Sequence, residues 1–289
     1  MKVLVTGGHG QLGRAVVRRG TVAGHTVASP DIGELDICSE ASVAAGLASA
    51  QPDLVINAAA YTAVDKAESE SERAFAINRD GAGILARACA ERGTPLLHVS
   101  TDYVFDGTKT GPYTEDDPIA PTSAYGTSKA AGEAEVQRAG GTVVRTSWLF
   151  EGKGPSFVHT MLRLANERPL MKVVADQHGC PTWADDLADG LLALAAHKDR
   201  GSLYHYCNDG ATTWHAFASA IIELARTHRP LAVERIEPIA TADYPTPAKR
   251  PANSVLDTSR IRALGIVPPH WRTGLAQVIA QELGSQGPA

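Results

Sequence analysis

The stretch that decides the fold is KVLVTGGHGQLG, residues Lys2–Gly13. A short apolar run is followed by a G-x-x-G-x-x-G spacing that opens into a segment of helical composition. Such a turn needs glycine because the chain bends tightly and its N–H groups must approach a pyrophosphate at the positive end of the helix. The pattern predicts a dinucleotide-binding turn; a strand-to-helix turn without ligand is the alternative. Its expected cofactor-binding residues are Gly7, Gly10, Gln11, Leu12 and Gly13.

Short apolar runs alternate with alanine-rich stretches through the first half of the chain. Several runs are apolar throughout, as strands covered on both faces are. This alternation predicts an α/β fold, a Rossmann-like doubly wound parallel sheet. Strands are expected at residues 2–6, 25–29, 53–58, 95–100 and 142–149, and helices at 11–20, 39–50, 71–91 and 123–139.

The pattern becomes less regular beyond about residue 150, where prolines interrupt it, most densely in Pro238–Pro251. We therefore predict two domains. Residues 1–150 form the dinucleotide-binding Rossmann domain, and residues 151–289 form a smaller lobe, woven around the sheet edge, that mainly binds substrate. Helices are still expected in this lobe at 155–168, 183–197, 212–227 and 271–283.

Composition and charge exclude several classes of protein. The chain has 289 residues, and its 27 basic and 32 acidic residues give a net charge of −5 without a basic block. A nucleic-acid partner is therefore not expected. No apolar run approaches the ~18–20 residues of a membrane span, and the first residues lack a secretory pattern. The four cysteines show no Cys-x-x-Cys spacing, so we expect reduced thiols and a cytoplasmic protein without a membrane partner.

An acidic residue follows the second expected strand. Asp31 stands 18 residues after Gly13, where a carboxylate accepts hydrogen bonds from the adenosine ribose and repels a 2′-phosphate, which favours NADH. Arg14 can neutralise a phosphate near the turn, so NADPH also remains a candidate cofactor. A solvated loop carboxylate is the alternative for Asp31. Asp36 and Ile37 are predicted to bracket the adenine edge.

A Tyr-x-x-x-Lys pair, Tyr125 and Lys129, points from one face of a predicted helix. An ammonium beside a phenol favours the phenolate, so Lys129 is expected to lower the pKa of Tyr125 and make it a general acid or base. The fourth expected strand ends in Ser100-Thr101-Asp102, at the edge where open α/β sheets bind ligands. A hydroxyl there can bond a reacting carbonyl oxygen. From the spacing alone, either Ser100 or Thr101 can supply that hydroxyl.

The glycine turn, the Asn57–Ala60 strand end, the strand-end hydroxyl and the Tyr-Lys pair together resemble the extended short-chain dehydrogenase/reductase superfamily. Longer motifs across nearly the whole chain resemble the dTDP-4-dehydrorhamnose reductase family. They are NAAAYTAVDKAE (57–68), STDYVFDG (100–107), YGTSKAAGE (125–133), RTSW (145–148), DQHGCPT (176–182) and YPTPAKRPANS (244–254).

The resemblance implies reduction, by NADPH or NADH, of the keto group of a dTDP-linked 4-keto-6-deoxy-L-sugar to complete dTDP-L-rhamnose. Tyr125 then takes the role of general acid, Lys129 holds the nicotinamide ribose, and Thr101 binds the sugar oxygen. Trp148 and Arg250 are expected at the sugar and the diphosphate; a core aromatic and a solvated loop charge are the alternatives. The remaining implied residues are Ala58, Ala59 and Ala60 for the cofactor, and Thr62, Val64 and Asp102 for the substrate.

Some members of the family are described as dimers that hold magnesium through glutamates. Ala15 stands here where one carboxylate is expected, although Asp185 and Glu282 match the other two, so we predict no metal. A monomer and a homodimer both remain open. So do a 4-ketoreductase or epimerase acting on another nucleotide-linked deoxysugar, and a non-catalytic dinucleotide-binding regulatory subunit.

Overall fold

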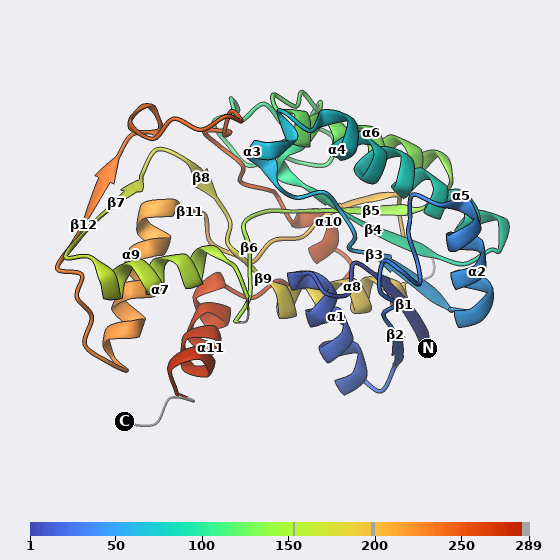
Figure 1. Cartoon of the computed structure of the whole chain (residues 1–289), viewed down its shortest axis with the longest axis horizontal. Helices are drawn as coiled ribbons and strands as arrows, with labels where there is room; N and C mark the ends of the chain where they lie inside the picture. Colours follow the sequence, from blue (N-terminus) through green and yellow to red (C-terminus); the bar gives the residue numbers. More distant parts are fainter. Residues whose placement is uncertain (153, 198–199, 285–289) are drawn as a thin grey trace.

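A computed structural model describes residues 1–152, 154–197 and 200–284 (Figure 1). Its centre is a sheet of six strands in the order β10-β5-β4-β3-β1-β2. Every neighbouring pair is parallel. The strands are β1 (Lys2–Thr6), β2 (Thr26–Ala28), β3 (Leu54–Asn57), β4 (Leu96–Thr101), β5 (Thr142–Thr146) and β10 (Leu203–His205).

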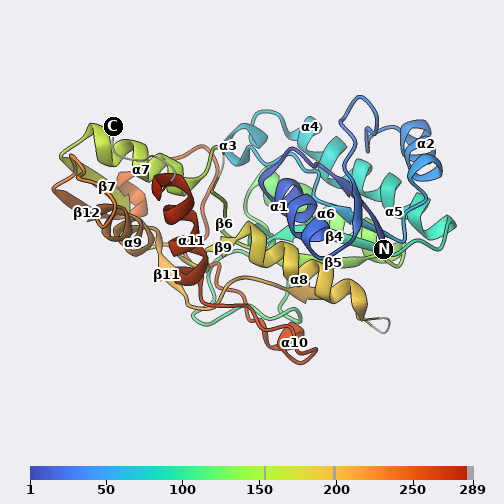
Figure 2. The same cartoon turned by 90° about the horizontal axis from the view of Figure 1, so that it is seen from below.

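Helices cover both faces of this sheet (Figures 1 and 2). Val3 and Val5 of β1 pack toward one face, in a core shared with α1 and α8, whereas Leu4 packs toward the other. Both sides of each inner strand are buried, which explains the uninterrupted apolar runs. The predicted doubly wound α/β fold is confirmed. The helices are α1 (Gln11–Val22) and α8 (Ala184–Ala196) on one face, and α2 (Glu40–Ala50), α5 (Ala82–Glu91) and α6 (Ala124–Arg138) on the other.

The strand order creates a crevice at one end of the sheet. The chain runs from β1 to β2 on one side of it and then crosses to β3 on the other side. Loops that leave β1 and β3 therefore diverge, and ligands of open α/β sheets bind at such a switch point. The glycine turn follows β1, and the Ala58–Ala60 segment follows β3.

Two predicted elements differ in detail from the structure. The helix expected at 71–91 consists of α4 (Ser71–Phe75), a π-helical turn at Ala76–Gly81, and α5. The strand expected at 142–149 ends at Thr146, because Trp148 has a left-handed backbone with φ of 46°. The chain resumes as β6 (Leu149–Phe150), which pairs with β9 (Thr182–Trp183) away from the main sheet.

A second lobe lies beside the sheet, at the left of Figure 1. Its core contains Phe150, Phe217, Trp271 and Leu275. Because α8 and β10 return from this half of the chain to complete the first domain, the two halves interlock; the division at residue 150 stays a prediction. The lobe contains α7 (Phe157–Glu167), α9 (Trp214–Arg226), α11 (Trp271–Gly284), β7 (Leu170–Val174), β8 (His178–Gly179), β11 (Thr212–Thr213) and β12 (Arg235–Ile239). The short helices α3 (Val64–Ala67) and α10 (Ser259–Arg262) lie in connecting segments.

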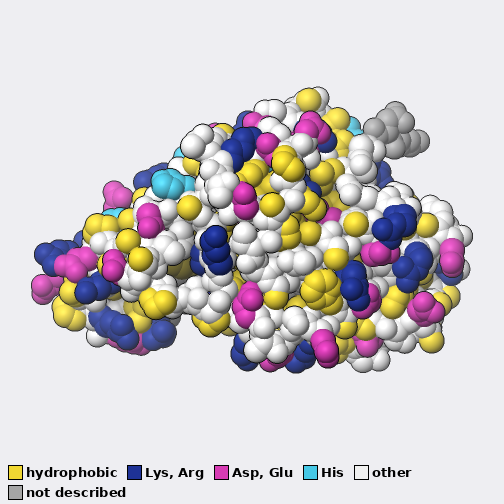
Figure 3. Space-filling view, turned by 90° about the horizontal axis from the view of Figure 1, so that it is seen from above, with side chains coloured by type: hydrophobic (Ala, Val, Ile, Leu, Met, Phe, Trp, Pro, Cys, Tyr) yellow, Lys and Arg dark blue, Asp and Glu magenta, His cyan; other side chains and the backbone are white. Residues whose placement is uncertain are grey.

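The surface carries charges of both signs. On the face that Figure 3 shows, basic and acidic side chains are interspersed among uncharged ones, without a continuous basic area. None of the helices in the described residues is long and apolar enough to span a membrane.

Candidate active site

The glycine turn has the shape of a phosphate cradle. Gly7 has φ of 70°, and a Cβ there would lie 2.6 Å from the backbone nitrogen of Ala59. A Cβ on Gly13 would lie 2.2 Å from the Gly7 carbonyl oxygen, so both positions exclude side chains. Gly10 stands at the N-terminus of α1, where backbone N–H groups lack partners within the helix. The turn therefore fits a pyrophosphate.

One cavity of about 770 Å³ runs from this turn across the carboxyl ends of the strands. Its volume is within the range of small-molecule sites. Nearly all predicted site residues lie in its lining. They are Gly7, Gly10, Gln11, Leu12, Asp31, Asp36, Ile37, Ala58, Ala59, Ala60, Thr62, Val64, Thr101, Asp102, Tyr125, Lys129 and Trp148.

Two predicted site residues lie outside the cavity lining. Gly13 lies beneath the turn, against Gly7 and Gly8, and so acts by allowing close packing. The Arg250 guanidinium donates to Asp65 at 2.7 Å and lies 6.0 Å from the Tyr103 ring centroid. Since Tyr103 lines the cavity, Arg250 stands directly behind the wall rather than in it.

The residues predicted for the adenosine side, Asp31, Asp36 and Ile37, line one end of the cavity. Asp31 is exposed and pairs with His9, a lining residue that sequence analysis did not single out. Asp36 accepts from the backbone N–H of Cys38 at 2.9 Å, while Ile37 is buried. Arg14 binds Glu151 and the His9 carbonyl. Its guanidinium therefore supports the turn, and its role toward a phosphate stays a prediction.

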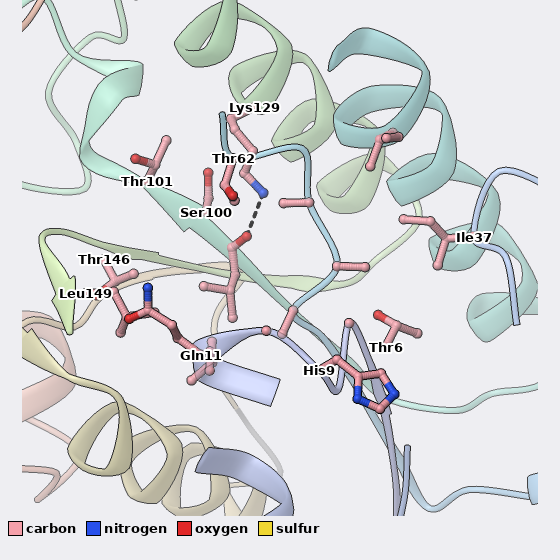
Figure 4. A pocket seen from close by; sticks show the side chains of 18 of the residues that line it. Thr6, His9, Gln11, Ile37, Thr62, Ser100, Thr101, Lys129, Thr146 and Leu149 are labelled. Carbon is pink, nitrogen blue, oxygen red and sulfur yellow. Dashed lines mark hydrogen bonds between the residues drawn. The ribbon is translucent and has the colours of Figure 1, made fainter. Parts of the chain in front are cut away.

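The predicted catalytic residues Tyr125, Lys129 and Thr101 also line the cavity. Figure 4 shows Thr101 and Lys129 at the end away from His9. Thr101 donates to the Asp102 carboxylate at 2.9 Å. Ser100 is buried, and its hydroxyl has no partner among the described residues. A phenol and two hydroxyls therefore surround the position where a carbonyl oxygen can bind.

The predicted lowering of the Tyr125 pKa by Lys129 is wrong in this structure. Burial raises the pKa of Tyr125. Lys129 instead donates to the Val99 carbonyl at 2.7 Å and contacts His98 at 3.2 Å. A phenol with a raised pKa keeps its proton at neutral pH, which suits a proton donor.

The sequence left two interpretations of Trp148 open, a residue of the sugar pocket and an aromatic residue of the core. Its surroundings have features of both. Its ring lines the cavity and stacks on Trp214 with centroids 3.6 Å apart. Gly179 makes this packing possible, because a Cβ there would lie 2.4 Å from the indole. Strained backbone at a non-glycine residue commonly marks a functional site.

The carboxylates considered for a metal are engaged elsewhere. Asp185 pairs with Arg18, and Glu282 lies 3.0 Å from His159. In residues 1–152, 154–197 and 200–284, no three His, Cys, Asp or Glu side chains are grouped closely enough to hold a metal ion.

Comparison with known proteins connects this geometry to a family. The model of the RmlD substrate binding domain family matches residues 1–283. The chain belongs to this family. A relative from Burkholderia thailandensis, named dTDP-4-dehydrorhamnose reductase, is 47% identical over 286 residues, which cover 94% of this chain and 96% of the relative.

Solved structures of other proteins named dTDP-4-dehydrorhamnose reductase share the fold of this RmlD-family protein. The crystal structure from Clostridium acetobutylicum is 37% identical, with a TM-score of 0.92, and covers 97% of this chain and 99% of that one. The structure from Bacillus anthracis, in complex with NADP, is 36% identical, with a TM-score of 0.91 and coverage of 97% and 100%.

Asp102 destabilises the fold of this RmlD-family protein when it is ionised. Burial raises its pKa from 3.8 to about 6, against a hydrogen bond from Thr101. A carboxyl whose pKa is raised by folding gives stability that is complete below the unfolded value and lost as pH rises through about 6. Asp102→Asn is therefore expected to be more stable above this pH, by up to ~3 kcal/mol for a shift of about two units.

Urea unfolding of both proteins across this pH range checks the prediction. The gain should disappear in acid, where the wild-type carboxyl is protonated. Asp106→Asn is the matched control of opposite sign, because hydrogen bonds from Thr108 and Tyr113 lower the pKa of Asp106. A constant difference between Asp102→Asn and the wild type at every pH would show that Asp102 is not destabilised by burial of its charge.

The sequence motifs did not identify several residues in and around the cavity. Trp214 comes from α9, far along the chain, and had no signal beyond being an aromatic residue. His9 lies inside the quoted turn, but the turn pattern concerns only glycines. Asn78 was also missed: it bonds the Tyr61 backbone and Ser128 from within the π-helical turn, which ties the β3 loop to α6.

Proposed function

We propose that this protein is an NAD(P)H-dependent reductase that converts dTDP-4-dehydro-6-deoxy-L-mannose to dTDP-L-rhamnose. The observation that carries the proposal is the meeting of Tyr125, Thr101 and Lys129 in a cavity that continues to a phosphate-binding turn. Relatives that match over nearly the full chain bear the name dTDP-4-dehydrorhamnose reductase, which supports the substrate.

The cradle formed by Gly7 and Gly10 at the start of α1 fits the pyrophosphate of a dinucleotide. The Bacillus anthracis relative, which has the same fold at a TM-score of 0.91, is solved in complex with NADP. Bound NADPH or NADH supplies the hydride. Asp31 and His9 stand at the adenosine end and are the residues that we expect to discriminate between the two cofactors.

Tyr125 is the proton donor in the proposed reaction. Hydride addition to C4 leaves negative charge on the sugar oxygen, and the Tyr125 phenol delivers its proton there. Thr101 turns its hydroxyl from Asp102 to the same oxygen and stabilises its charge. Lys129 holds the nicotinamide ribose, and Trp148 packs against the sugar and helps to exclude water. Thr62 and Val64, in the loop after β3, complete the wall around the sugar.

The substrate test is consumption of the reduced cofactor by the purified full chain. Reaction with dTDP-4-dehydro-6-deoxy-L-mannose is followed by absorbance of the reduced nicotinamide, with NADPH and with NADH, and the product is identified by mass and by NMR of C4. We expect consumption matched one-to-one by dTDP-L-rhamnose.

Controls separate the remaining alternatives. Omitting the sugar measures background oxidation, and the UDP-linked counterpart tests the nucleotide. An epimerase would change the sugar without net consumption of cofactor. Cofactor binding without turnover of any 4-keto sugar would overturn the proposal in favour of a binding subunit. Light scattering of the same sample decides between the monomer and the homodimer.

A further inference from the structure

Lys129 lies at the end of a buried chain of polar side chains that runs across three strands. Thr6 on β1 donates to Asn57 on β3 at 2.7 Å, and Asn57 lies 2.9 Å from Nδ1 of His98 on β4. His98 in turn places Nε2 at 3.2 Å from Nζ of Lys129. All four side chains are at most 2% exposed. Because buried polar groups need matched partners, the proton positions along this chain are constrained.

The orientation of the Asn57 amide is determined by a backbone group. The N–H of Ala59 can only donate, and it points at Asn57 Oδ1 at 3.1 Å. The hydroxyl of Thr6 donates to the same oxygen. Oδ1 is therefore the acceptor on that side, and the NH₂ group of Asn57 faces His98.

This orientation determines the tautomer of His98. The Asn57 NH₂ group only donates, so Nδ1 of His98 must accept and cannot carry a hydrogen. Burial holds the pKa of His98 well below its ordinary value, so the ring is neutral. In a neutral ring without hydrogen on Nδ1, the hydrogen is on Nε2, the atom that faces Lys129.

An ammonium group has no lone pair and cannot accept a hydrogen bond. A neutral amine can accept from His98 Nε2 while it donates to the Val99 carbonyl at 2.7 Å. We propose that His98 is a positioning residue that donates Nε2–H to Lys129 and thereby favours its neutral amine form over the ammonium. Since Lys129 is catalytic in the proposed function, the relevance of His98 to turnover rests on that proposal.

The charged and titratable groups near Lys129 come from α6, from β5 and from the segment after β4. Glu133, on α6, favours the ammonium form, but it is itself paired with Arg145 of β5. Tyr125 on α6 and Tyr103 after β4 are phenols with raised pKa values, and Asp102 is bonded to Thr101. Burial exceeds the effect of Glu133 and lowers the pKa of Lys129 to about 8. The donor at His98 works in the same direction.

The first test is the tautomer of His98, read by ¹H–¹⁵N correlation NMR of the full chain labelled in histidine, with His98 assigned from His98→Gln. We expect hydrogen on Nε2 and none on Nδ1. In Asn57→Asp the carboxylate can only accept a hydrogen bond, so the hydrogen of the His98 ring should move to Nδ1. Hydrogen on Nδ1 in the wild type would overturn the proposal, and this measurement needs no variant with altered folding.

The second test is titration of Lys129, followed by ¹³C NMR of labelled lysine and assigned from Lys129→Arg. His98→Gln offers Lys129 a carbonyl acceptor, so the proton affinity of Lys129 should rise about tenfold or more, in line with ~1.5–3 kcal/mol for a hydrogen bond to a charged group. His159→Gln, which alters a partly buried histidine of the second lobe bonded to Ser156 and Glu282, is the control and should leave the titration unchanged.

An unchanged Lys129 titration in His98→Gln, or an equal shift in His159→Gln, would refute the positioning role. Both measurements use the protein without cofactor or sugar. Failure of the proposed substrate would therefore leave their outcome untouched, and failure of the His98 proposal would leave the reductase assay untouched.

Discussion

Tyr125→Phe is expected to lower kcat by about 10²–10⁴-fold, the usual contribution of a positioned general acid. The ring keeps its packing against Tyr103, whose centroid is 5.5 Å away, while the proton donor is lost. Cofactor affinity should stay close to that of the wild type, because the phosphate cradle is formed by a different part of the chain. Steady-state kinetics and fluorescence titration with NADPH measure the two quantities separately.

The matched control is Tyr113→Phe. Tyr113 is also a buried phenol with a hydrogen bond, to Asp106 at 2.8 Å, but it does not line the cavity. Loss of the Tyr113 hydroxyl should lower the free energy of unfolding and leave kcat nearly unchanged. Turnover of Tyr125→Phe at the wild-type rate would show that another group protonates the sugar, and Thr101 with Asp102 would then be the next candidates.

Glu133→Gln is expected to destabilise the protein by about 3–5 kcal/mol, the cost of leaving one partner of a buried ion pair unmatched. Glu133 and Arg145 are both at most 3% exposed and share three hydrogen bonds of 2.7–3.1 Å. The Arg145 guanidinium also lies 5.1 Å from the Phe105 ring. The pair ties α6, which carries Tyr125 and Lys129, to β5, so activity should fall as well. Urea unfolding measures the loss.

Two further variants separate charge from packing. Glu135→Gln, on the same helix, removes partly exposed pairs with Arg87 and Arg138, and should cost no more than ~1 kcal/mol. Combining Glu133→Gln with Arg145→Met removes both buried charges and should recover much of the stability. Equal losses in Glu133→Gln and Glu135→Gln would show that burial adds nothing to the pair.

Much of the first domain could be predicted because its signals are local. The apolar run Lys2–Thr6 and the glycines after it report directly on a covered strand and a tight turn, and β1 has the predicted bounds. The helix predicted at 123–139 matches α6, which begins at a Ser123 cap. Tyr125 and Lys129 could be paired from their spacing alone, since a helix brings residues four apart together.

The amino-acid sequence by itself determined the α/β class, the cofactor turn and the Tyr-Lys pair, because backbone sterics and helical periodicity act over a few residues. Only the tertiary structure decided what depends on contacts between distant segments. It brought Trp214 against Trp148, returned β10 to the sheet, and directed Lys129 toward His98 instead of Tyr125. Proton positions and pKa values follow from burial and from partners that are supplied by other strands, and local sequence patterns do not specify those partners.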